Sequence, residues 1–92
     1  MRHGRRDANH AEIRDALRDV GWTVQDLGDV GKGCPDLLVG AGGVNVLLEV
    51  KSDGGKLTDD ERLFVDTWRG PVFVVYSVGD AVEAVTGVMR RG

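Results

Sequence analysis

Residues 33–51 read GCPDLLVGAGGVNVLLEVK, and this stretch decides the fold. Two apolar runs, 37–39 and 44–48, are separated by the glycine-rich segment 40–43. Short apolar runs on either side of a glycine-rich turn are typical of a β-hairpin. The sequence therefore predicts two antiparallel strands joined by a tight turn.

The register of this hairpin follows from the position of its turn. If the turn is centred between Gly42 and Gly43, Asp36 lies opposite Glu49, and opposed side chains point to the same face of the sheet. Their Cβ atoms would then be about 5 Å apart. Because side chains alternate along a strand, Lys51 shares that face with Glu49. The other face of this strand carries an apolar row that we expect in the core: Val46, Leu48 and Val50.

Hydrophobic periodicity predicts the elements on either side of the hairpin. A helix is expected over residues 8–20, followed by a strand over 22–25. A second helix begins at the capping-box pattern of Thr58 and Glu61 and ends at Gly70-Pro71. Its apolar face predicts that three residues pack inward: Phe64, Val65 and Trp68.

The C-terminal part of the chain predicts one more strand and one more helix. Residues 72–76 form a continuous apolar run, which favours a strand buried on both faces. Ser77 and Asp80 form a second capping-box pattern at the start of a last helix. The element order is α-β-β-β-α-β-α. We therefore predict an α/β fold with a mixed central sheet flanked by helices, in which the last strand joins by a right-handed crossover.

Length and composition indicate a single globular domain over residues 1–92, with 41% hydrophobic and 29% charged residues. No apolar run approaches the ~20 residues of a membrane span, and no apolar signal core follows the basic N-terminus, which favours a cytoplasmic protein. A single cysteine, Cys34, excludes an intrachain disulfide and is expected as a small buried apolar group.

The net charge of −3 argues against binding to nucleic acid through bulk electrostatics. It does not exclude an enzyme whose carboxylates hold divalent cations, because a bound metal reverses the local sign. Phosphate contacts would then be local, with Arg5, Arg6, Lys32 and Lys56 as candidates. Residues 1–6 are expected to form a flexible basic arm. Ordinary solvent exposure explains these residues about equally well.

Asp36, Glu49 and Lys51 form a constellation suited to metal-assisted hydrolysis. Two adjacent carboxylates repel, so one has a raised pKa unless a cation lies between them. Mg²⁺ or Mn²⁺ is the expected occupant, since both prefer oxygen ligands. Such a metal activates water, and a lysine beside it stabilises charge on a phosphate. Glu12, at the edge of the apolar stripe of the first helix, is a candidate further ligand.

Each part of this constellation has an ordinary explanation when it is taken alone. A Pro-Asp pair is common in turns, and a Glu-x-Lys strand end is usually a solvated face. Their combination at one end of a hairpin favours function. Among the remaining polar residues, His10 is expected at the surface, while Asp26 is explained equally well by turn chemistry and by assistance to a metal.

The segments 31–39, 46–52 and 56–58 resemble the VRR-NUC branch of the PD-(D/E)xK nuclease superfamily, and above all the small stand-alone domains carried by bacteriophages. The resemblance implies a restriction-endonuclease-like core and Mg²⁺- or Mn²⁺-dependent cleavage of DNA phosphodiester bonds. Stand-alone members are similar to Holliday-junction resolvases and act as dimers. The resemblance therefore implies structure-specific cleavage of branched DNA by a homodimer, in the host cytoplasm if the chain is phage-encoded. No feature predicts a small-molecule cofactor.

The same resemblance assigns roles to individual residues. It implies metal binding by the side chains of Glu12, Asp36 and Glu49 and by the backbone carbonyl of Val50, with Lys51 as the catalytic lysine.

The chain departs from the family pattern at the start of the second helix. The family usually has a glutamine there, whereas residues 57–62 read LTDDER. Glu61 is a possible accessory residue at this place, but its carboxylate accepts hydrogen bonds without donating any. The departure and the acidic charge motivate an alternative, a non-catalytic DNA-binding module of the same fold. An RNA-directed nuclease is a third reading.

Overall fold

The computed structural model of the protein describes residues 8–92, so Arg5 and Arg6 lie outside the described residues. The order α-β-β-β-α-β-α expected from the sequence is confirmed. The elements are α1 (His10–Asp19), β1 (Thr23–Asp26), β2 (Leu37–Ala41), β3 (Val44–Val50), α2 (Asp59–Thr67), β4 (Val72–Val75) and α3 (Val78–Arg91).

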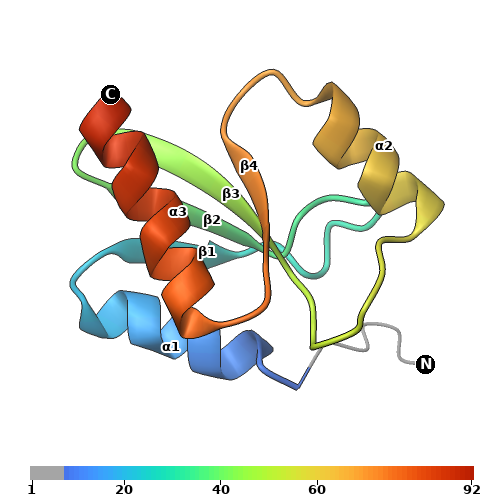
Figure 1. Cartoon of the computed structure of the whole chain (residues 1–92), viewed down its shortest axis with the longest axis horizontal. Helices are drawn as coiled ribbons and strands as arrows, with labels where there is room; N and C mark the ends of the chain where they lie inside the picture. The colour runs from blue at the N-terminus through green and yellow to red at the C-terminus, as the bar shows by residue number, and fades with distance from the viewer. Residues whose placement is uncertain (1–7) are drawn as a thin grey trace.

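The four strands form one mixed sheet in the order β1-β2-β3-β4 (Figure 1). β1, β2 and β3 are antiparallel, and β4 lies parallel to β3. In the hairpin Leu37 lies opposite Leu48 and Ala41 opposite Val44, which is the register predicted from the turn. The turn residues Gly42-Gly43 both have positive φ, as a tight two-residue hairpin turn requires.

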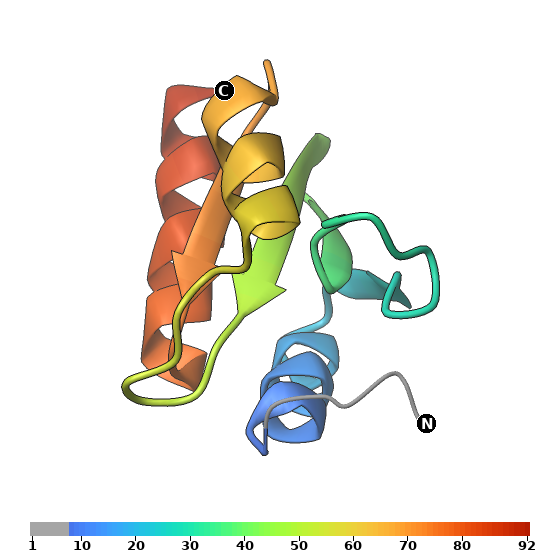
Figure 2. The same cartoon turned by 90° about the vertical axis from the view of Figure 1, so that its right-hand side faces the viewer.

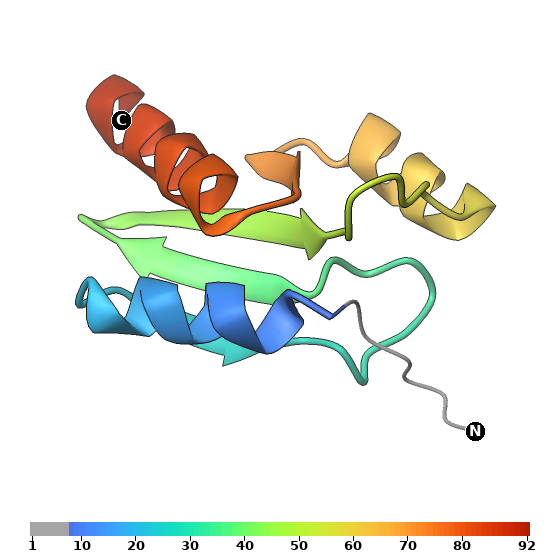
Figure 3. The same ribbon diagram turned by 60° about the horizontal axis from the view of Figure 1, so that its bottom comes forward.

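The core lies between one face of the sheet and the helices α1 and α3, which run along it (Figure 3). β3 contributes the expected apolar row, and α1 contributes Ile13 and Leu17, both fully buried. Val20, at the end of the same helical stripe, is instead 55% exposed. The helix has already ended at Asp19, and Gly21 follows with a positive φ. The α3 stripe is buried at three positions: Ala81, Val85 and Val88.

α2 stands apart from the other two helices (Figure 1), and its first turn lies beside the loop between β1 and β2 (Figure 2). Within Asp59–Thr67 no residue is buried. Phe64 and Val65 are half-buried, whereas Trp68 is 50% exposed. The prediction that all three pack inward is therefore only partly right.

β4 is an edge strand, because it pairs with β3 alone among the described strands. Its residues are half-buried except Val75, so the prediction of a strand buried on both faces is wrong. A continuous apolar run is compatible with either position, and α3 covers β4 on one face. Among residues 8–92, no helix combines the length and the apolar character needed to cross a membrane.

Candidate active site

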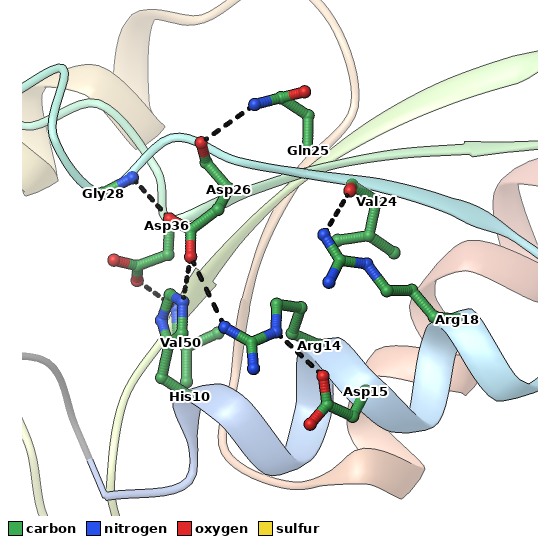
Figure 4. A network of polar contacts seen from close by, with 10 residues as sticks. All are labelled: His10, Arg14, Asp15, Arg18, Val24, Gln25, Asp26, Gly28, Asp36 and Val50. Carbon is green, nitrogen blue, oxygen red and sulfur yellow. Dashed lines mark hydrogen bonds and ion pairs between the residues drawn. The ribbon is translucent and has the colours of Figure 1, made fainter.

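Asp36 and Glu49 come together at the open end of the β2–β3 hairpin. Asp36 directly precedes Leu37, the first residue of β2, and Glu49 directly follows Leu48, the partner of Leu37 on β3. A carboxylate oxygen of Asp36 accepts a 2.8 Å hydrogen bond from the backbone N–H of Val50 (Figure 4). The Asp36 carboxylate is also close enough to Glu49 to raise the pKa of Glu49. They therefore lie side by side, as the register predicts.

Glu49 is a buried carboxyl group, with only 2% of the residue exposed. Burial and the neighbouring carboxylates of Asp36 and Glu61 raise the pKa of Glu49 to about 9, although Lys51 opposes this shift. Burial and like charges both disfavour the ionised form.

Lys51 lies on the same face of the sheet as Glu49. Its Nζ is 3.6 Å from a carboxylate oxygen of Glu49 and 2.7 Å from one of Glu61. The Lys51 side chain is 12% exposed, so water screens these contacts less than it screens a surface ion pair.

Glu61 is held at the site by the cap of α2. Its carboxylate accepts a 2.9 Å hydrogen bond from the backbone N–H of Thr58, and the Thr58 hydroxyl accepts one of 3.2 Å from the Glu61 N–H. This confirms the predicted capping box. Burial alone would raise the pKa of Glu61, but Lys51 and Thr58 hold it below its ordinary value. Glu61 is therefore an ionised partner of Lys51.

The glycine-rich loop before β2 fixes the distance between Asp36 and α2. Gly33 has a φ of 79°, which L side chains rarely adopt. A Cβ at Gly33 would also collide with the backbone carbonyl of Asp60 and approach the N–H of Glu61. Glycine is therefore required for this close approach, which brings Glu61 next to the acidic pair.

The other predicted site residues show no direct bond to the carboxyl groups of Asp36 and Glu49 within the described part of the chain. Glu12 lies on the exposed side of α1, and among the described residues no hydrogen bond or ion pair joins it to the acidic pair. Lys32 and Lys56 are exposed loop residues. Cys34 is half-buried, and burial and the nearby carboxylates raise the pKa of its thiol, which disfavours a thiolate nucleophile. Within residues 8–92, no group of three or more His, Cys, Asp or Glu side chains is arranged around a metal position.

Comparison of the chain with protein-family models, with curated proteins and with solved structures finds no match. Function must therefore be argued from the geometry and the sequence pattern.

A second polar cluster, on α1 and β1, was not anticipated. His10 is 3% exposed, and its Nε2 lies 3.0 Å from a carboxylate oxygen of Asp26 (Figure 4). Arg14 lies 3.9 Å from the same oxygen. The prediction of a surface His10 is wrong. Its spacing from Ile13 and Leu17, i, i+3 and i+7, was the available signal, since it places all three on the buried stripe.

Asn9 ties the start of α1 to the ends of β3 and β4. Its side-chain amide donates hydrogen bonds of 3.2 Å to the carbonyl of Lys51 and 2.9 Å to the carbonyl of Tyr76. The backbone at Lys51 is thus held from α1 as well as from the sheet. Sequence reasoning assigned no role to Asn9, because nothing local distinguishes it from a helix cap.

Proposed function

We propose that this protein is a metal-dependent DNA endonuclease of the VRR-NUC type, with a restriction-endonuclease-like core. The observation that carries the proposal is the side-by-side pair of Asp36 and Glu49, with the ammonium group of Lys51 3.6 Å from Glu49. Glu49 is buried and Asp36 is half-buried, so ionising both carboxyl groups side by side costs free energy, which a bound cation would offset.

The donor set fits Mg²⁺ or Mn²⁺. Asp36 and Glu49 offer adjacent hard oxygen atoms, and a bound cation would offset the burial and like charge that raise the pKa of Glu49. The carbonyl of Val50 and, from α1, Glu12 are the further ligands proposed from the sequence pattern. A bound metal would supply Lewis acidity and lower the pKa of a coordinated water molecule.

Lys51 is proposed to act on the phosphate group. Its compact ammonium charge would orient the attacking water or stabilise negative charge that develops on the phosphoryl oxygens. Glu61 holds this ammonium group at the site before substrate binds. The phosphate would then compete with Glu61 for Lys51.

Structure-specific cleavage of branched DNA is the proposed activity. A domain of this size has little surface of its own for reading a base sequence. A branched duplex offers two symmetric strands, which a twofold homodimer would meet with two sites. Lys32 and Lys56, both exposed, are proposed phosphate contacts, together with Arg5 and Arg6. The homodimer proposal would be wrong if light scattering reports a monomer at micromolar concentration while junction cleavage is undiminished.

The test is cleavage of a labelled four-way junction with Mn²⁺. Asp36→Asn should weaken both cleavage and Mn²⁺ binding measured by calorimetry. Lys51→Ala should retain metal binding and lose about 100-fold or more in cleavage rate, because it removes transition-state stabilisation alone. Asp66→Asn, an exposed position on α2, is the matched control and should cut normally.

One observation favours the alternative of a non-catalytic DNA-binding module. Glu61 neutralises Lys51 across 2.7 Å, which is unfavourable for a catalytic cation. If the wild-type protein binds branched DNA but cuts no flap, fork, junction or single strand with either metal, this alternative becomes the better account. The same assay with RNA substrates distinguishes an RNA-directed nuclease, which would cut RNA and leave DNA intact.

A further inference from the structure

An apolar cavity of about 390 Å³ lies between α2 and the face of the sheet opposite the core. Phe64 and Trp68 form one wall, and their rings stack with centroids 4.8 Å apart and planes inclined by 15°. Trp68 is 50% exposed, so this aromatic pair remains accessible from solvent. The lining also includes Leu38, Leu47, Cys34 and Asn45.

Each wall of this cavity continues into the acidic site. On β3, Leu47 precedes Glu49 by two residues and shares its face, which places them about 7 Å apart along the strand. On α2, Phe64 follows Glu61 by one helical turn. The cavity and the acidic pair are therefore neighbouring parts of one surface.

We propose that this cavity binds an unpaired nucleobase of the DNA strand whose phosphate lies at Asp36 and Glu49. The inference rests on the proposed nuclease function and specifies its substrate. Bases stack on accessible aromatic side chains whatever their sequence. The volume lies within the range of small-molecule sites, and the lining includes the amide of Asn45, a group that can donate and accept hydrogen bonds at a base edge.

The proposal explains why branched DNA would be preferred to plain duplex. A base inside a continuous duplex is paired and stacked, so it enters a protein cavity only after unstacking, at a free-energy cost. A base at a branch point, a flap or a single strand is already unpaired. The cavity would then select for shape without reading sequence.

The test compares two versions of one cleavable junction or flap, one intact and one with an abasic nucleotide next to the cleaved phosphate. The wild type should cut the intact substrate about 5- to 150-fold more efficiently, the range expected for one stacked base. Trp68→Ala should cut both at the abasic rate. Trp68→Leu keeps apolar bulk for folding and should lose the preference too, whereas Trp68→Phe should keep most of it.

Leu63→Ala is the control, because Leu63 is 62% exposed on the same helix and does not line the cavity. It should retain the preference. A wild type that cuts both substrates equally, or a Trp68→Leu variant that keeps its preference, overturns the base site and leaves the nuclease proposal standing. A wild type that cuts neither substrate defeats the nuclease proposal itself. If Trp68→Leu instead converts a dimer to a monomer in light scattering and leaves the preference intact, a second copy of the chain covers the cavity, and the base site is wrong.

Discussion

The ammonium group of Lys51 lies 2.7 Å from a carboxylate oxygen of Glu61. The same carboxylate caps α2 through the backbone N–H of Thr58. The Glu61 carboxylate thus binds both a helix terminus and the lysine of the candidate site, while a carboxylate oxygen of Glu49 lies 3.6 Å from the same lysine. Lys51 therefore contacts two carboxylates, that of the capping residue Glu61 and that of the proposed metal ligand Glu49.

Replacing Glu61 by glutamine separates these two roles. Glu61→Gln keeps an oxygen that accepts the Thr58 N–H, so the cap of α2 should survive. It removes the negative charge opposite Lys51, which should leave the ammonium group more available to a phosphate. We expect kcat/KM for junction cleavage to rise, on the order of tenfold, or about 1.4 kcal/mol.

Glu83→Gln makes the same change in net charge on α3, at an exposed position, and should leave the rate unchanged. An unchanged or reduced rate in Glu61→Gln, with normal helix content by circular dichroism, would mean that the Lys51–Glu61 pair assists the reaction as it stands.

The pH dependence of stability should report the buried Glu49 in metal-free protein. Its pKa is about 9 in the folded chain, against an ordinary value of 4.5. Above the ordinary value the unfolded chain loses a proton that the folded chain retains, so this group favours folding less as pH rises. The contribution is most favourable below about pH 4.5 and declines until about pH 9.

Urea denaturation in chelator, from pH 5 to pH 9, measures this effect. Other groups titrate in the same range, so the comparison is between the wild type and Glu49→Gln. The glutamine variant should lack the part of the decline that Glu49 causes. Equal slopes in the two proteins would show that the carboxyl of Glu49 ionises normally after folding.

Local rules were sufficient for the hairpin and for its acidic end. The Gly42-Gly43 turn sets the register, the register pairs Asp36 with Glu49, and the alternation of side chains places Lys51 beside them. Each step depends on neighbours in one short stretch, so no tertiary information was needed.

Features that depend on distant parts of the chain were not predictable in the same way. The apolar face of α2 indicates which side turns inward, but not how much sheet is available to cover it, so Trp68 remains half exposed. The polarity of His10 indicated a surface position. Its burial depends on the carboxylate of Asp26, which lies on β1 and is not adjacent in the sequence. Glu12 lies at the edge of a helical stripe, where periodicity does not determine direction.

The His10–Asp26 contact should be worth measurable stability. Asp26 bonds His10 through one oxygen and accepts a 2.9 Å hydrogen bond from the Gly28 N–H through the other. His10→Ala removes a partner from this cluster and should lower the free energy of unfolding by about 1–3 kcal/mol. Asp29→Asn, at an exposed position in the loop that follows β1, should have little effect.

A double-mutant cycle tests whether the contact itself is responsible. His10→Ala and Asp26→Asn together should cost less than the sum of the two single changes, because either one already breaks the bond. Strict additivity in urea denaturation would assign the loss to packing of the imidazole ring alone.

Gly33→Ala should disrupt the junction between the loop and α2. The substitution meets two separate penalties, a φ of 79° and a collision of the new Cβ with the Asp60 carbonyl. Relief of the collision requires the N-terminus of α2 to move, and Glu61 moves with it away from Lys51. We therefore expect both a loss of stability and an altered rate of junction cleavage.

Gly31→Ala is the matched control, because Gly31 lies in the same loop with a φ of 81° and no described atom within 4 Å of its Cβ position. It meets the backbone penalty alone, about 1–2 kcal/mol. The additional loss in Gly33→Ala, measured by urea denaturation of both variants, is the cost of the collision. If the two variants lose equal stability and cleave equally well, the close approach of Gly33 to Asp60 does not position Glu61, and the cap of α2 alone holds that carboxylate beside Lys51.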